Sequence, residues 1–129
     1  MLHIVLFIIV IALILFELYE FIYSKNAINT EKAIELINRK NAIIIDTRSE
    51  NNFRICHIVS SINIPHDKIK KHVNVIKQYK KKTIIIIHYK NRLAQKLIND
   101  IKSNNFNDIF YIKDGLNAWN KHDLPTKKR

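Results

Sequence analysis

Four consecutive isoleucines, Ile84–Ile87, constrain the fold of this 129-residue chain more than any other stretch. A short, uninterrupted run of β-branched residues is typical of a strand buried on both faces, as in a parallel sheet. After a short polar loop, apolar residues recur at helical spacing, namely Leu93, Ala94, Leu97, Ile98 and Ile101. Ligands of α/β domains bind where such a strand ends, because the next helix points free N–H groups there. We therefore expect the functional site at residues 88–92.

Strands and helices are expected to alternate along the rest of the chain. The expected helices are 30–40, 67–79 and 114–121, with a polar turn or short helix at 49–54 that is anchored by Phe53; the expected extended segments are 42–45, 56–65 and 109–112. Thr30 is expected to cap the first helix and Asn41 to end it. This alternation predicts a parallel α/β sheet flanked by helices. Residues 25–29 are assigned to a linker, 30–125 to one domain and 126–129 to a disordered basic tail.

The N-terminal stretch 2–16 is apolar apart from His3, and the apolar pattern continues to residue 23. A helix over 2–23 would be about 33 Å long, enough to cross a bilayer core. A signal peptide is the alternative, but the stretch has neither a basic start nor a small-residue cleavage site. Residues 1–24 are therefore predicted to be a single-pass anchor in the inner (plasma) membrane. Basic residues follow this stretch and none precedes it, so the positive-inside rule puts the C-terminal domain in the cytoplasm.

The chain is strongly basic, with 22 Lys and Arg, 11 Asp and Glu, and a net charge of +11. The basic residues are scattered and form no aromatic-plus-basic stripe or DNA-binding motif, so no nucleic-acid partner is predicted. Their abundance, with that of Ile and Asn, fits coding bias toward AT-rich codons. All 22 follow Ser24, which favours contact with an anionic membrane surface. The single cysteine, Cys56, cannot form an internal disulfide, which suits a reducing compartment.

Three segments resemble the motifs of the rhodanese homology domain, in the same order and at matching spacing. They are Asp46–Arg48, Cys56–Pro65 and Gly115–Trp119, and the residues that match the family motifs most directly are Asp46, Arg48, His57, Asn63, Pro65, Gly115 and Trp119. The resemblance covers about residues 28–125 and implies a rhodanese-like fold. An apolar segment followed directly by one such domain is similar to membrane-anchored, single-domain members of the family.

The resemblance also implies where catalysis would occur. The family carries a nucleophilic cysteine at the end of its fourth strand, in a loop of the Cys-x-x-Gly type whose N–H groups cradle a persulfide. That position is occupied here by His88 and the loop glycine by Asn91, so the loop reads His88, Tyr89, Lys90, Asn91 and Arg92. Imidazole cannot carry a persulfide, so we predict a degenerate active-site loop with no catalytic residue and no cofactor. Lys90 and Arg92 at the helix start could still attract an anion.

Several motif residues have a simple structural interpretation. Asp46 and Arg48 are expected to form an internal ion pair, His57 to be a hydrogen-bonded structural histidine, and Trp119 to anchor the last helix in the core. Cys56 stands where the family has a turn glycine, so it is expected to be a loop residue. The spacing of Cys56, His57 and His88 matches no metal motif, and no metal site is predicted.

Three functional hypotheses follow. The first is a membrane-anchored rhodanese-like domain without the catalytic cysteine, which binds or recruits a membrane protein or an anion-bearing partner. The alternative is an active sulfurtransferase that uses Cys56 or the thiol of a partner. A third hypothesis, compatible with the composition, is a drifting remnant with little selected function.

Overall fold

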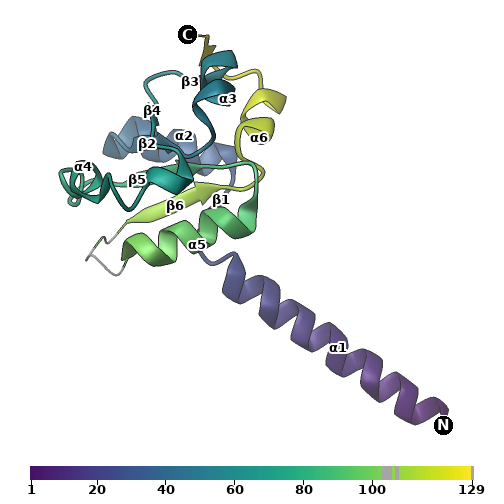
Figure 1. Ribbon diagram of the computed structural model, residues 1–129. Coiled ribbons are helices and arrows are strands. Elements are labelled where there is room, and N and C mark those ends of the chain that lie inside the picture. Colours follow the sequence, from purple (N-terminus) through teal and green to yellow (C-terminus); the bar gives the residue numbers. More distant parts are fainter. Residues whose placement is uncertain (103–105, 107, 129) are drawn as a thin grey trace.

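The isoleucine run forms strand β5 (Ile84–Ile87) at the centre of a five-stranded sheet in the computed structural model, which describes residues 1–102, 106 and 108–128 (Figure 1). From one edge to the other the strands are β1 (Ala27–Ile28), β6 (Ile109–Ile112), β5, β2 (Ile43–Asp46) and β4 (Ile62–Asn63). Every neighbouring pair is parallel. The predicted parallel α/β sheet is therefore confirmed, and the carboxyl ends of its strands meet at one end of the sheet.

Side chains of β5 alternate between two separate cores, one on each face of the sheet. Ile84 and Ile86 pack on one face under α4 (Val73–Lys77) and α5 (Asn91–Lys102). Ile85 and Ile87 pack on the other under α2 (Thr30–Lys40) and α6 (Gly115–Lys121). All four isoleucines are fully buried. Because successive strand residues point to opposite faces, only a strand covered on both sides can be apolar at every position, as the sequence indicated.

Helix α2 has an asparagine at each end, one that caps it through its side chain and one that ends it through its backbone conformation. The predicted cap at Thr30 is wrong by one residue: the side chain of Asn29 accepts a hydrogen bond from the Lys32 N–H at 2.8 Å. The predicted end at Asn41 is confirmed, because this residue adopts a left-handed conformation (φ 51°) and its N–H donates to the Leu36 carbonyl. Asparagine tolerates this conformation better than most residues, which suits a chain with one glycine.

Both ends of the domain extend beyond the boundaries that the sequence suggested. The assigned linker 25–29 contains β1, which pairs with β6 at the edge of the sheet. The expected disordered tail contains β7 (Thr126–Lys127), which pairs antiparallel with β3 (His57–Ile58) in a small second sheet. A strand of two residues is too short to show an alternation of apolar and polar residues, and it is defined by a partner that is distant in the sequence. Neither β1 nor β7 was therefore predicted.

Two central segments are more broken than expected. The helix predicted over 67–79 is wrong: the chain forms a 3₁₀ turn, η1 (His66–Lys68), then bonded turns and the short helix α4. Ile69 in the turns and Ile76 in α4 are still buried, and both belonged to the apolar pattern that suggested one long helix. The extended segment 56–65 contains β3 and β4, separated by a turn in which Ser60 has a φ of 69°. Before it, α3 (Glu50–Ile55) buries Phe53, as predicted.

The apolar N-terminal stretch forms one helix, α1 (Leu2–Tyr23), that extends away from the domain (Figure 1). Residues Leu2–Ile22 are long and apolar enough to cross a membrane, and none of them is buried against the domain. Length and composition of this kind are shared by membrane anchors and by N-terminal signal sequences.

Candidate functional site

His88 lies at the carboxyl end of β5, between β2 and β6, so its predicted position after a central parallel strand is confirmed. Its side chain is 1 % exposed. The backbone N–H of Lys90 donates a hydrogen bond to its Nδ1 at 3.0 Å. Because Nδ1 accepts, the proton of the neutral imidazole is on Nε2. Among the described residues no group accepts a hydrogen bond from this buried Nε2.

The surroundings of His88 keep its ring uncharged. The pKa of His88 is lowered from 6.5 to about 4, mainly by burial and then by the charge of nearby His66, against the opposite effects of the Lys90 hydrogen bond and of Asp46. The ring meets His66 edge to face at 5.4 Å and stacks on Tyr89 at 4.5 Å between centroids. At neutral pH the imidazole at the end of β5 is therefore uncharged, and its Nε2–H is buried.

The remaining loop residues point in different directions. Tyr89 is exposed, and the Lys90 ammonium lies 5.5 Å from the centre of its ring. Helix α5 begins at Asn91, so the loop is two residues shorter than expected. The Asn91 side chain donates to the Asp114 carboxylate and accepts from the Asp114 N–H. The Arg92 guanidinium lies 4.8 Å from the ring centre of Tyr19 in α1, so the loop contacts the apolar helix.

The predicted ion pair between Asp46 and Arg48 is present beside the loop and is almost fully buried. The Arg48 Nη2 donates to the Asp46 carboxylate at 2.7 Å and to the Cys56 carbonyl at 2.6 Å. The Asn63 side chain donates to the carbonyls of Asp46 and Arg48. These motif residues thus tie the end of β2 to the segment 56–63, which is a structural role.

Cys56 and His57 lie in a separate part of the fold. Cys56 is a half-buried free thiol at the junction of α3 and β3. His57 is buried, its Nδ1 lies 2.7 Å from the Phe53 carbonyl oxygen, and its ring stacks on Phe53 at 3.8 Å. His57 is therefore the structural histidine that the sequence suggested, and Cys56 is in a loop. Within the part of the chain that the structure describes, no three His, Cys, Asp or Glu residues are placed to hold a metal ion.

The C-terminal motif, Gly115–Trp119, packs against the loop at His88 through Gly115. A Cβ on Gly115 would lie 2.3 Å from the His88 carbonyl oxygen, and the φ of Gly115 is 54°. Trp119 is buried in the core with its Nε1 donating to the Pro125 carbonyl at 3.1 Å, which confirms its role as an anchor. Pro65 follows β4 and precedes η1, whose first residue His66 meets His88. His66 was not predicted as a site residue, although its place just after a parallel strand was a usable signal.

Comparison with known proteins identifies the class of fold and its relatives. The profile of the rhodanese-like domain matches residues 29–122, so the chain belongs to the rhodanese-like domain family. An uncharacterized protein of Buchnera aphidicola subsp. Baizongia pistaciae is 32 % identical over 120 residues, which cover 90 % of this chain and 82 % of the relative. The uncharacterized protein YibN of Escherichia coli K12 is 30 % identical over 95 residues, covering 73 % and 66 %.

A solved structure supports the same fold. The rhodanese-related protein of Thermoplasma volcanium superposes with a TM-score of 0.69 at 20 % identity, covering 81 % of this chain and 99 % of that one. This likeness concerns the fold alone. The chemistry of the strand-end loop has to be derived from this chain's own residues.

Proposed function

We propose that this protein is a membrane-anchored, rhodanese-like binding module that recruits a partner and does not transfer sulfur at its strand-end loop. The observation that carries the proposal is His88 at the end of β5, where the family resemblance expects a thiol. Rhodanese chemistry needs a thiolate that takes up a sulfane sulfur as a persulfide. A neutral, buried imidazole has no sulfur with which to form that persulfide, so a binding role is favoured over sulfur transfer at this loop.

The apolar helix α1 supports a single-pass anchor in the inner (plasma) membrane. No Lys or Arg precedes it, whereas Lys25, Lys32, Arg39 and Lys40 follow it, which favours a cytoplasmic domain. A membrane protein or an anion-bearing molecule is the partner class that this position suggests. A reporter fused after residue 129 that is active only outside the cytoplasm would contradict the orientation. Crosslinking in intact membranes followed by affinity purification would identify the partner.

The alternative function is sulfur transfer through Cys56 or through the thiol of a partner. The half-buried Cys56 favours this alternative, because it is a free cysteine and is not fully buried. Its position at the α3–β3 junction argues against it, since sulfur chemistry in this fold takes place at the strand-end loop. By the family resemblance, the loop whose N–H groups cradle a persulfide corresponds to residues 88–92 and not to Cys56.

The deciding experiment measures sulfur transfer from thiosulfate to cyanide with the full chain in detergent micelles. We expect no turnover above the uncatalysed rate, and mass spectrometry is expected to find no persulfide on Cys56. Turnover that is abolished by Cys56→Ala would overturn the binding-module proposal. In a second variant, His88→Cys, a persulfide on residue 88 would show that the loop still forms the family's anion cradle.

A further inference from the structure

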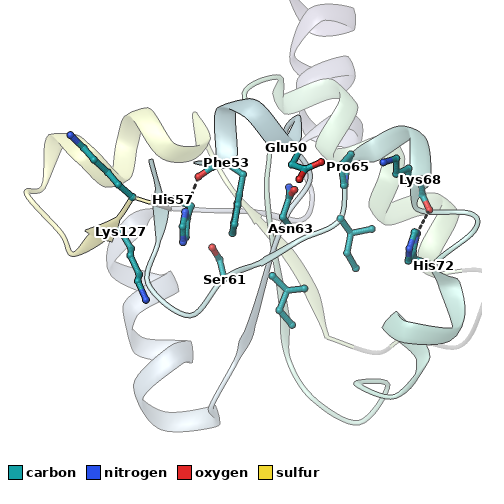
Figure 2. A pocket seen from close by; sticks show the side chains of 12 residues that line it. Glu50, Phe53, His57, Ser61, Asn63, Pro65, Lys68, His72 and Lys127 are labelled. Carbon is teal, nitrogen blue, oxygen red and sulfur yellow. Dashed lines mark hydrogen bonds between the residues drawn. The ribbon is translucent and has the colours of Figure 1, made fainter. Parts of the chain in front are cut away.

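A groove lies beside the edge strand β4, and none of residues 88–92 lines it. It has a volume of about 640 Å³ and is lined by α3, β3, β4, η1 and β7 (Figure 2). Helix α1 leads into β1, at one edge of the sheet, whereas β4 is at the other edge. Four strand spacings, about 19 Å, separate these edges. The groove is therefore beside the edge strand that is farthest from the strand that α1 leads into.

One wall of the groove is the free edge of β4. Five consecutive residues, 61–65, line it. A strand that lines a groove with one face would contribute only alternate residues, so here the edge itself forms the wall. The Ile64 N–H donates to the Asp46 carbonyl in β2. Because successive residues point their backbone groups to opposite edges, the N–H and C=O of Asn63 point away from β2, toward the groove.

The side walls combine apolar surface with positive charge. Phe53, Ile64 and Pro65 contribute apolar surface. The charged rim is basic: Lys68 from η1, Lys127 from β7 and the following Lys128 are all exposed, and Figure 2 shows Lys68 and Lys127 on opposite sides. The one acidic lining residue, Glu50, is already paired with Arg54 at 2.7 Å.

We infer that this groove binds an extended, acidic segment of a partner protein, which adds to β4 as a further strand. An open strand edge pairs with extended backbone, and pockets beside it accept alternate side chains. The lysines on both rims attract acidic side chains of the incoming segment and set its register. This inference rests on the proposed recruitment function and names its partner class, but it uses a surface distinct from the loop at residue 88.

The test uses the full chain in zwitterionic detergent micelles and a short fluorescein-labelled peptide that alternates glutamate with valine or threonine. Fluorescence anisotropy is expected to show saturable binding that the double variant Lys68→Glu/Lys127→Glu weakens by about tenfold or more. The matched control is Lys96→Glu/Lys102→Glu on α5, which changes the net charge equally but lies outside the groove, and it is expected to change binding by less than about twofold. An equal loss in both double variants would overturn the inference.

Two further probes test the geometry. A peptide N-methylated at alternate residues cannot pair with the strand edge, and we expect it to bind at least about tenfold more weakly. Unchanged affinity would contradict strand addition. Binding to vesicles that contain anionic lipid is measured in parallel. If Lys68→Glu/Lys127→Glu weakens vesicle binding but leaves peptide binding unchanged, the groove is a lipid-binding site and the inference is wrong. Because none of these readouts involves sulfur transfer, their failure is distinguishable from failure of the proposed function.

Discussion

The carbonyl oxygen of His88 lies so close to Gly115 that a Cβ at residue 115 would be 2.3 Å from it. Gly115 also has a φ of 54°, in the left-handed region that favours glycine. The chain has one glycine, and it is placed where the loop at the end of β5 meets the start of α6. The shape of the loop and the identity of residue 115 therefore depend on each other.

Gly115→Ala is expected to destabilise the domain by about 1–3 kcal/mol or more, since strained backbone and the close contact add. The buried Trp119, the chain's one tryptophan, reports unfolding by its fluorescence. Asn117→Ala on the exposed side of the same helix is the control, with a change within about 0.5 kcal/mol. If both variants have the same free energy of unfolding, the close approach of His88 does not require glycine at residue 115.

Arg48→Ala is expected to destabilise the domain by about 3–5 kcal/mol, because it leaves the buried Asp46 carboxylate without its cation. The exposed pair of Arg54 and Glu50 supplies the control. Arg54→Ala should lower stability by only about 0.2–1 kcal/mol, as is usual for surface ion pairs. Urea unfolding followed by tryptophan fluorescence measures both. Similar losses would show that burial does not distinguish the two pairs.

Because the pKa of His88 is lowered in the folded state, we expect the domain to lose stability as the pH falls from 6.5 toward 4. The folded state lowers the pKa of His88 to about 4, so between these values the unfolded chain binds a proton that the folded chain excludes. Stability is complete above pH 6.5, and at most about 3 kcal/mol is lost by pH 4, at about 1.4 kcal/mol per pKa unit. Thermal unfolding at a series of pH values measures the slope.

His88→Gln is the control for this pH dependence, because glutamine does not titrate. We expect a flatter stability profile between pH 6.5 and 4 in this variant. An unchanged slope would assign the acid sensitivity to other groups. Direct titration of the His88 ring by NMR, with an inflection near pH 4, would support the same cause.

Ending the chain after Pro125 is expected to remove β7 and to leave β3 without its strand partner. A loss of about 1 kcal/mol is expected, as for the net contribution of one or two backbone hydrogen bonds. The truncation keeps the Pro125 carbonyl that Trp119 contacts, so the core is expected to stay intact. Acidic-peptide binding should weaken with the loss of Lys127 and Lys128. A truncated protein with unchanged stability and binding would show that β7 contributes to neither.

Local patterns in the sequence were enough to predict the alternation of the main strands and helices of the domain. Continuous isoleucine in β5 required cover on both faces, and the spacing in α5 required an apolar side, because these patterns reflect burial of single elements. The same local reading placed His88 at a strand end and the helix end at Asn41. The family motifs then fixed the class of protein, which the comparisons confirmed.

Tertiary structure alone decided which distant residues meet. Strands β1 and β7 have two residues each and exist only through pairing with β6 and β3. The approach of Gly115 to His88 and the edge contact of His66 with His88 likewise join separate segments. A local pattern carries no information about such partners, because their energy comes from contacts across the fold. The same reason explains why the groove beside β4 was visible only once the chain was folded.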